Sequence, residues 1–318
     1  MNGSVGRGMM AGGWGVNSQG ISVVVPHYGD IRPTCDLVTS LRRQQGAPDL
    51  QIIVADDASP IPFPSGCGYE TVRRETNGGY GSACNLGASV ARHDRILFLN
   101  SDLQIEDRFV ADLLAEARPW QPAVVSPAIE EPSGTNHVPR VFPRPRHYVI
   151  EWLVPLARFE RYMWWQGWIG HDVRAVLSEH AVPTDWVVGA AHMMPTAEFR
   201  AVGGFDEGFH MNCEETDLHR RLNDRGIPAV YLPTVRAHHT AGGSSDPLKR
   251  NGWLVTSRFR YAEKWGGARR LYLGLLFATW INWVWNLQRQ LRGLDVQAGR
   301  VLRLQMSWVK QGWRARKP

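Results

Sequence analysis

Apolar runs that end in acidic or amide side chains constrain the fold of this chain more than any other feature. Residues 96–99 (ILFL) are apolar without alternation, which is typical of a strand buried on both faces of a parallel sheet. Asn100 and Asp102 follow this run, just as Asp56 follows the run at 50–54. Ligands bind beyond the carboxyl ends of the strands in open α/β sheets, so these positions predict a binding site.

Asp102 supports two interpretations. A carboxylate at a strand end can hold Mg²⁺, because this ion usually takes one or two protein carboxylates together with substrate phosphates. Asp is also a favoured N-cap, and a helix is expected over residues 106–118. This segment by itself leaves both interpretations open.

The order of the expected elements predicts an α/β fold. Strands alternate with helices, which indicates a single domain with a mostly parallel, right-handed central sheet flanked by helices. The G-x-G-x-x-G turn of a dinucleotide fold does not follow the first strand, and the sequence contains no P-loop. The expected strands cover residues 21–25, 50–54, 96–99, 123–126 and 229–232, and the expected helices include 33–45 and 106–118.

The cysteines give no sign of a zinc site or a disulfide framework. The 318 residues contain four cysteines without a C-x-x-C pair, and no apolar signal segment opens the sequence. We therefore expect a cytoplasmic protein. Residues 1–20 are rich in Gly, Ser and Asn and are expected to be a flexible leader.

Two segments between the expected strands suit ligand binding. A Gly-rich turn at 77–81 leads into a helix of small residues, whose first amides can bind phosphate or ribose. The same glycines also suit a tight turn with close helix–sheet packing. Residues 130–183 form a long aromatic-rich insertion, expected to be a lid or acceptor-binding loop, whose rings suit sugar stacking, lipid contact or packing on the sheet edge.

A second group of ionisable residues lies in the second half of the chain. Glu214, Glu215 and Asp217 fall within one helical turn, where carboxylates repel, bind a cation or raise one another's pKa. A solvated helix start with acids at its N-terminus is the alternative. His238 and His239 precede a Gly-rich segment, and an imidazole there can share a metal ion with a carboxylate or be structural.

Residues 249–318 form a strongly basic extension. They hold 15 of the 36 Lys and Arg residues but only two of the 30 acidic ones, so their net charge is +13 against −7 for the preceding residues. As a helix, the apolar run at 271–287 would reach about 25 Å, short of a bilayer core of roughly 30 Å. We expect peripheral attachment to an anionic membrane surface, with packing on the protein or on a second subunit as the alternative. No nucleic-acid-binding motif accompanies the charge.

Seven segments occur in an order that is found in a known enzyme family. They are VVVPHYGD, VADDAS, NGGYGSACNLG, LFLNSD, DWVVGA, GGFDEGFHMNCEETDL and HHTAGGSS. This set resembles family 2 glycosyltransferases with the GT-A fold, in particular the bacterial rhamnosyltransferase-like group. The resemblance implies a GT-A-type catalytic domain over residues 21–248, followed by a helical extension at 249–318.

The resemblance also implies a nucleotide-sugar donor and a divalent cation, Mg²⁺ or Mn²⁺. Asp102 matches the metal-holding end of the family's D-x-D motif, whose first position is Asn100 here. His238 matches the C-terminal metal histidine, with His239 as the alternative register. The positions that match the donor site are Pro26 and Tyr28 beside the nucleotide, Asp56 and Asp57 at the base, and Asn77, Gly78 and Asn85 on the ribose and phosphate side.

For catalysis, Glu215 matches the aspartate base of the family's Glu-Asp pair, with Glu214 as a supporting carboxylate. Trp186 and Gly189 match the acceptor segment. The implied reaction is inverting transfer of a sugar, rhamnose by family likeness, from a dTDP, UDP or GDP donor to a glycan or polyprenyl-diphosphate-linked acceptor in cell-surface polysaccharide synthesis. Because a glutamate replaces the aspartate, a non-catalytic nucleotide-sugar-binding protein is the alternative.

Overall fold

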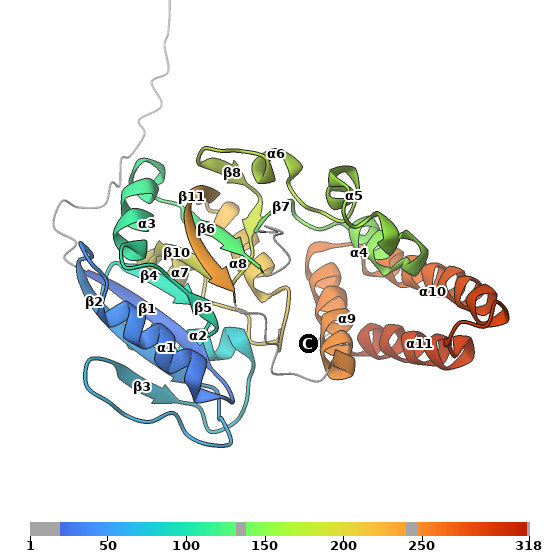
Figure 1. Ribbon diagram of the computed structural model, residues 1–318, viewed down its shortest axis with the longest axis horizontal. Helices are drawn as coiled ribbons and strands as arrows, with labels where there is room; N and C mark the ends of the chain where they lie inside the picture. The colour runs from blue at the N-terminus through green and yellow to red at the C-terminus, as the bar shows by residue number, and fades with distance from the viewer. Residues whose placement is uncertain (1–19, 132–137, 240–246, 317–318) are drawn as a thin grey trace, which may run out of the picture.

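The protein consists of a sheet part and a helical part that lie next to each other (Figure 1). The computed structural model describes residues 20–131, 138–239 and 247–316, so nearly all of the expected leader at 1–20 lies outside the described residues. The strands are β1 (Gly20–His27), β2 (Asp49–Asp56), β3 (Glu70–Arg73), β4 (Arg95–Leu99), β5 (Leu103–Gln104), β6 (Val124–Glu130), β7 (Pro139–Arg140), β8 (Val182–Thr184), β9 (Trp186–Val187), β10 (Ala191–Pro195) and β11 (Ala229–His239).

The helices include all of those that the sequence predicts. Of these, α1 overlaps the expected 33–45 segment but ends at residue 42, and α3 lies within the expected 106–118 segment. The helices are α1 (Ile31–Arg42), α2 (Tyr80–Ser89), α3 (Phe109–Ala117), α4 (Pro145–Trp152), α5 (Met163–Trp168), α6 (Val173–Val176), α7 (Thr196–Ala201), α8 (Glu214–Asn223), α9 (Pro247–Trp265), α10 (Ala268–Leu291) and α11 (Ala298–Ala315), with 3₁₀ turns η1 (Arg118–Trp120) and η2 (Val154–Phe159).

The predicted α/β fold with a mostly parallel sheet is confirmed. Strands β3, β2, β1 and β4 pair in parallel, and β6 pairs in parallel with β11. Strand β10 runs antiparallel between β4 and β6 and joins the two parallel sets into one sheet. The five expected strands are present as β1, β2, β4, β6 and β11, whereas β10 was not predicted because its sequence, AHMMP, has neither alternation nor β-branched residues.

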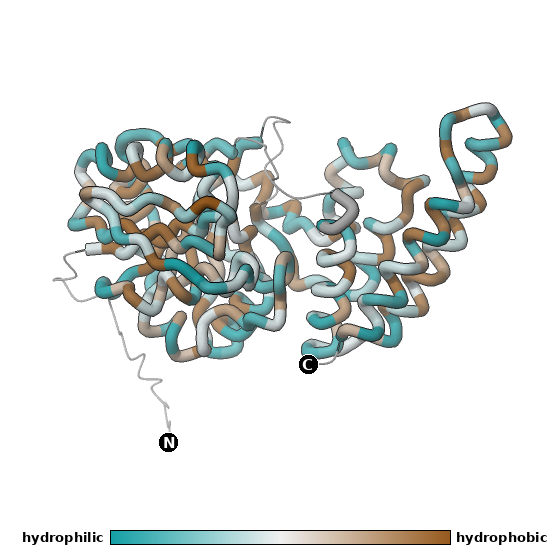
Figure 2. Tube along the Cα trace, turned by 90° about the horizontal axis from the view of Figure 1, so that it is seen from below, coloured by the Kyte–Doolittle hydropathy of each residue, from teal (hydrophilic) through white to brown (hydrophobic). Residues whose placement is uncertain are grey.

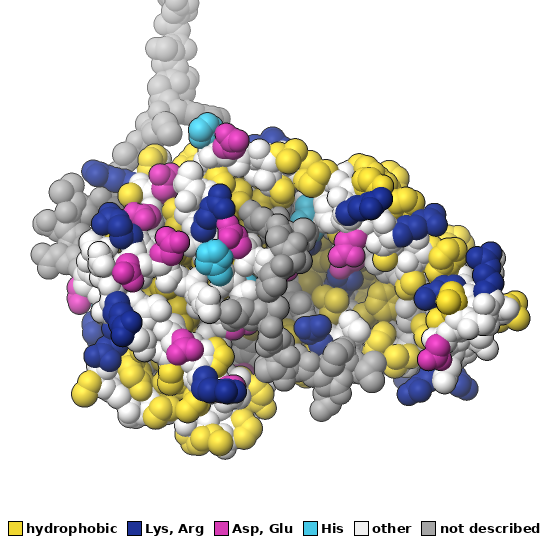
Figure 3. All heavy atoms as spheres, viewed as in Figure 1, with side chains coloured by type: hydrophobic (Ala, Val, Ile, Leu, Met, Phe, Trp, Pro, Cys, Tyr) yellow, Lys and Arg dark blue, Asp and Glu magenta, His cyan; other side chains and the backbone are white. Residues whose placement is uncertain are grey.

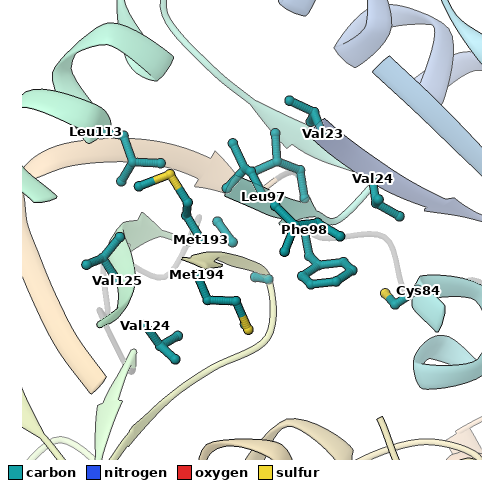
Figure 4. Close-up of a cluster of buried hydrophobic side chains, with 14 of the residues drawn as sticks. Val23, Val24, Cys84, Leu97, Phe98, Leu113, Val124, Val125, Met193 and Met194 are labelled. Carbon is teal, nitrogen blue, oxygen red and sulfur yellow. The ribbon is translucent and has the colours of Figure 1, made fainter. Parts of the chain in front are cut away.

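The core of the sheet part consists of side chains from adjacent strands and from covering helices, such as Cys84 of α2 and Leu113 of α3 (Figure 4). Residues 96–99 of β4 are fully buried, as their continuous apolar run predicts. Phe98 lies against Phe199 and Phe205, with ring centroids 5.2 and 5.5 Å apart. Burial on both faces of the sheet therefore holds the β4 end, and the polar residues after it, at a defined place.

The helical part has its own apolar cluster. Phe259 of α9, Leu271 and Leu275 of α10 and Val309 of α11 are buried there together with Tyr148 of α4. Hydrophobic and hydrophilic residues alternate along these helices, whereas hydrophobic residues are concentrated in the centre of the sheet part (Figure 2). None of the described helices combines the length and the hydropathy that a bilayer span requires.

One buried carboxylate connects the two parts. Asp217 of α8 is fully buried. It accepts hydrogen bonds from Arg221 Nε and Trp265 Nε1, both at 2.8 Å, and it lies 2.8 Å from Lys264 Nζ. Of the three acids in the first turn of α8, Asp217 thus has a structural role, because its oxygens are occupied by partners on α8 and α9.

We expect Asp217→Ala to lower the free energy of unfolding by about 3 kcal/mol, because removing one partner leaves buried charges uncompensated. Asp224→Ala, at the exposed end of the same helix, should stay within about 0.5 kcal/mol of the original protein. Urea unfolding followed by circular dichroism measures both. Equal stability of the two variants would contradict the structural role of Asp217.

Candidate active site

A cavity of about 270 Å³ lies where β4 and β11 end and α2 and α8 begin. It collects polar side chains from segments that are distant in sequence, as expected at the carboxyl edge of an α/β sheet. Its lining residues are Tyr80, Asn100, Ile129, Glu131, Val138, Val188, Gly189, Ala190, Met211, Asn212, Glu214, Glu215 and His239.

The two adjacent glutamates enter this cavity from the first turn of α8. The two residues before them, Asn212 and Cys213, have left-handed backbone conformations with φ of 69° and 68°. Such conformations are strained for residues other than glycine and occur where the surrounding structure enforces them, often at functional sites. This sharp turn allows α8 to begin at the cavity, so that Glu214 and Glu215 both line it.

Burial makes both carboxyl groups hold their protons more strongly. Burial and the neighbouring Glu215 raise the pKa of Glu214 well above its ordinary value. Burial also raises the pKa of Glu215, but the Arg140 guanidinium and a hydrogen bond from the Gly189 amide act in the opposite direction. The pair therefore has distinct environments, in which Arg140 and backbone hydrogen bonds favour the ionised form of Glu215, the form that a proton acceptor needs.

Several buried polar atoms around the cavity have no hydrogen-bond partner in the described structure. Two are carboxylate oxygens, one each on Glu214 and Glu215. The others are Asn100 Oδ1 and Asn212 Nδ2. Buried polar groups are rarely left without partners, so donors and acceptors that point into a cavity indicate a polar ligand.

Asp102 pairs with the second of the two candidate histidines. His239 Nε2 lies 3.1 Å from Asp102 Oδ2, and both side chains are about one-quarter exposed, at 26% and 27%. His238, the first choice by family register, instead faces Glu130, with Nδ1 3.1 Å from Oε2. The alternative register is therefore the one that brings an imidazole to Asp102.

The Asp102–His239 pair suits a divalent cation that also binds substrate oxygens. The described residues contain no group of three or more His, Cys, Asp or Glu side chains spaced for a metal ion. Two protein ligands are nevertheless what Mg²⁺ usually takes, with phosphates and water completing its shell. The N-cap alternative for Asp102 does not hold, because α3 begins later, at Phe109.

The carboxylates of the two aspartates at the end of β2 bind groups of the protein itself. Asp56 is fully buried, accepts from the amides of Ser59 at 2.8 Å and Phe63 at 3.0 Å, and forms an ion pair with Arg73. Asp57 accepts from the amides of Gly78 at 2.9 Å and Gly79 at 2.8 Å. The Asp56 carboxylate is bound by protein groups in this structure, and its expected contact with a base stays a prediction.

The Gly-rich turn is a tight packing turn, the second of its two interpretations. Gly79 has φ of +88°, and a Cβ there would lie 1.7 Å from the His210 carbonyl oxygen. The Gly78 and Gly79 amides are donated to Asp57 and are not available to phosphate. The turn instead holds the start of α2 against the loop that precedes α8.

The remaining expected donor residues divide between the surface and the interior. Tyr28 is 48% exposed after β1, and Pro26 is partly buried beside it, so this edge can still border a nucleotide. Asn77 is exposed, and its Nδ2 lies 3.3 Å from the Asp57 carbonyl oxygen. Asn85 exchanges hydrogen bonds of 2.9 Å with the backbone of Phe205 and does not line the cavity, and its expected place beside ribose stays a prediction.

The two expected acceptor residues also differ. Gly189 lines the cavity, and its carbonyl accepts a hydrogen bond of 2.6 Å from the Tyr80 hydroxyl. Trp186 is buried outside the cavity lining, where its indole donates to the Val141 carbonyl at 2.9 Å. Its ring supports Arg140, whose guanidinium carbon lies 5.8 Å from the ring centroid. Trp186 thus contributes indirectly, through the arginine that stabilises ionised Glu215.

Sequence reasoning missed several residues of the site, of which three are polar groups near Glu214 and Glu215. Tyr80 and Asn212 line the cavity, and Arg140 acts electrostatically on Glu215. Tyr80 and Asn212 fall inside the quoted segments NGGYGSACNLG and GGFDEGFHMNCEETDL, so those segments carried a signal for them. Arg140 lies in the insertion, where no motif distinguishes it from the other arginines.

Comparison with known proteins agrees with this arrangement. A model of the family described as glycosyl transferase family 2 matches residues 22–176. The pre-mycofactocin glycosyltransferase of Mycobacterium tuberculosis is 28% identical over 231 residues, which are 71% of this chain and 43% of that protein. This chain therefore spans less than half the length of that relative.

Two further comparisons concern a shorter relative and a solved structure. The N-acetylglucosaminyl-diphospho-decaprenol L-rhamnosyltransferase of M. tuberculosis is 26% identical over 217 residues, covering 66% of this chain and 68% of that protein. The crystal structure of GalNAc-T7 with UDP, GalNAc and Mn²⁺ superposes with a TM-score of 0.53 at 15% identity, covering 78% of this chain and 48% of that one. The matched family model and the named relatives show that this chain is similar to glycosyltransferase family 2, and the solved structure shares its fold.

Proposed function

We propose that this protein is a metal-dependent, inverting glycosyltransferase that moves a sugar from a nucleoside-diphosphate sugar to a hydroxyl group. The observation that carries the proposal is one cavity lined by both the buried Glu214–Glu215 pair and the His239 side chain that contacts Asp102. A proton acceptor and a site for diphosphate charge are what this reaction needs. A protein that only bound the donor would have no need of a buried, ionisable carboxylate.

In the proposed mechanism Glu215 acts as the general base. Its carboxylate takes the proton of the acceptor hydroxyl while that oxygen bonds to the anomeric carbon, and the bond from this carbon to the diphosphate breaks. Attack opposite the leaving diphosphate inverts the configuration. A cation held by Asp102 and His239 would act as a Lewis acid that neutralises the negative charge of the diphosphate.

Glu214 and Arg140 would support the base in different ways. Glu214, whose pKa is raised well above its ordinary value by burial and by Glu215, stays protonated and adds no second negative charge to the site. Arg140 stabilises the ionised form of Glu215. This combination keeps one carboxylate available as a base in a buried site.

The substrates are proposed from the relatives. Rhamnosyl transfer to a diphospho-decaprenol-linked sugar is printed in the name of one M. tuberculosis relative, and an Escherichia coli relative named rhamnosyltransferase WbbL is 34% identical over 82 residues. We therefore propose a deoxyhexose such as rhamnose as the sugar and a polyprenyl-diphosphate-linked glycan as the acceptor. Such an acceptor would place the enzyme in the cytoplasm at the inner face of the cell membrane, in cell-surface polysaccharide synthesis.

Glu215→Gln should reduce sugar transfer by about 10²-fold or more while leaving donor binding intact, because it preserves size and removes basicity. Glu214→Gln is the matched control, and it should retain most activity because Glu214 is already neutral. Transfer kinetics and donor titration calorimetry measure the two effects. If Glu215→Gln transferred sugar normally and Glu214→Gln lost transfer, Glu214 would be the base and Glu215 the supporting carboxyl group.

His239→Ala should weaken Mn²⁺ binding by about 10-fold or more and lower transfer, whereas His238→Ala should change neither. The two histidines are neighbours on β11, so the second variant is a control for any general effect on the strand. Titration calorimetry with Mn²⁺ gives a readout that is independent of activity. If His238→Ala weakened Mn²⁺ binding and His239→Ala did not, His238 would be the ligand. Full activity of either variant in a chelator would show that the reaction needs no metal ion.

The pH dependence of transfer should report the pKa of Glu215. Since burial raises this pKa from 4.5, kcat/KM should rise with pH along an acidic limb that lies above pH 4.5. Arg140→Gln removes a charge that lowers this pKa, so the limb should move to higher pH. Arg225→Gln, which affects an arginine paired with Glu198 away from the cavity, should leave the limb in place. An unshifted limb in Arg140→Gln would show that Arg140 does not act on the base.

A further inference from the structure

Helix α10 exposes apolar side chains on one face, while the face that packs on the protein buries polar side chains beside the apolar Leu271 and Leu275. Thr279, Asn282 and Asn286 are buried on its inner face. The Asn282 carboxamide accepts from the Val154 amide at 2.9 Å and donates to the Trp152 carbonyl at 2.8 Å. The polar groups of α10 are therefore used for packing inside the protein.

The outer face of α10 is an exposed apolar ridge. We define the outer ridge as Leu273, Phe277, Trp280, Val284 and Leu291, whose side chains are between 47% and 80% exposed. Their spacing of three, four or seven residues places them on one side of the helix. Exposed single apolar residues are ordinary, but a continuous ridge on a polar protein marks a surface that another apolar body covers.

The charges around the ridge decide which kind of partner fits. The ridge is bracketed by Arg269 and Arg270 before it and by Arg289 and Arg292 near its end. The whole extension, 249–318, carries a net charge of +13. A second copy seated on the ridge would bring two such charges together, whereas an anionic lipid surface would neutralise them.

A second exposed cluster of aromatic rings lies at α5, which follows the η2 segment that contacts α10. Tyr162, Trp164 and Trp168 are between 40% and 56% exposed, and the Trp164 ring centroid is 5.1 Å from that of Trp168. The Arg161 guanidinium lies over the Tyr162 ring, 4.9 Å from its centroid. The cluster follows η2, which begins at the centre of α10, and hydrophobic and basic side chains lie together over α5 and α10 (Figure 3).

We propose that the outer ridge of α10 and the aromatic cluster of α5 dock this protein on the headgroup region of an anionic lipid leaflet. Trp, Tyr and Arg are favoured at that depth, because each presents both an apolar body and a polar group. Aliphatic residues of the ridge would insert between the lipids, while the flanking arginines would contact their phosphates. The inference adds a partner to the proposed function but rests on the helical part alone.

The test mixes the full chain with vesicles and measures its sedimentation. Vesicles of phosphatidylglycerol and phosphatidylcholine in equal parts should bind the protein at low salt, and pure phosphatidylcholine vesicles should bind it far less. The triple variant Leu273→Gln, Phe277→Gln and Trp280→Gln should lose affinity on the order of 100-fold. Ile61→Gln, which changes an exposed apolar residue of the sheet part, should bind like the original chain.

A second arm tests the charges, and a mass measurement tests the rival partner. Arg269→Gln with Arg270→Gln should weaken binding by about fivefold for each arginine and reduce its salt dependence. Light scattering should give the same mass for the original chain and the triple variant. Equal sedimentation of the original chain and the triple variant with vesicles would overturn the proposal. The proposal would also fail if the original chain bound no vesicles and formed a dimer that the triple substitution converts to a monomer. Because sedimentation needs no sugar transfer, either outcome would leave the proposed reaction untouched.

Discussion

The position of one antiparallel strand determines the candidate site. β10 pairs with β4 from Ala191 opposite Leu99 onward, so the residues just before it lie beside the end of β4. The Asn100 amide donates to the Ala190 carbonyl at 2.8 Å, and this bond holds the Gly189 segment against the cavity. The Gly189 amide in turn reaches Glu215. Without β10, the end of β4 and the start of α8 would have no common edge at which to meet.

Burying two adjacent carboxyl groups lowers the free energy of unfolding, and the surrounding residues offset only part of this loss. An ionised carboxylate loses solvation on burial, so the pKa values of Glu214 and Glu215 both rise. The left-handed backbone at Asn212 and Cys213 adds strain immediately before them. Strain and desolvation concentrated at one cavity are what a site selected for chemistry would show, since neither contributes to folding.

The helical part meets the sheet part through buried polar contacts and through a small shared apolar cluster. Asp217 binds Lys264 and Trp265, and Phe209 and Cys213 pack against Tyr261 of α9. Polar contacts of this kind are directional, so they define how α9 meets α8. The outer face of α10 remains exposed, although α10 has the most apolar sequence of the extension.

The sequence by itself determined the α/β class and five of the strands, because continuous apolar runs report burial whatever their partners are, and it indicated the segments that line the candidate site. Only the tertiary structure decided which side chain of each segment faces the cavity. Asp56 and Asn85 turned inward because backbone amides elsewhere needed acceptors. His239 and not His238 reached Asp102, because β11 changes register between Leu232 and Arg236. Adjacent strand residues point to opposite faces, so the odd shift of three residues, four on β11 against one on β6, exchanges them, and no pattern in the sequence records where that shift occurs.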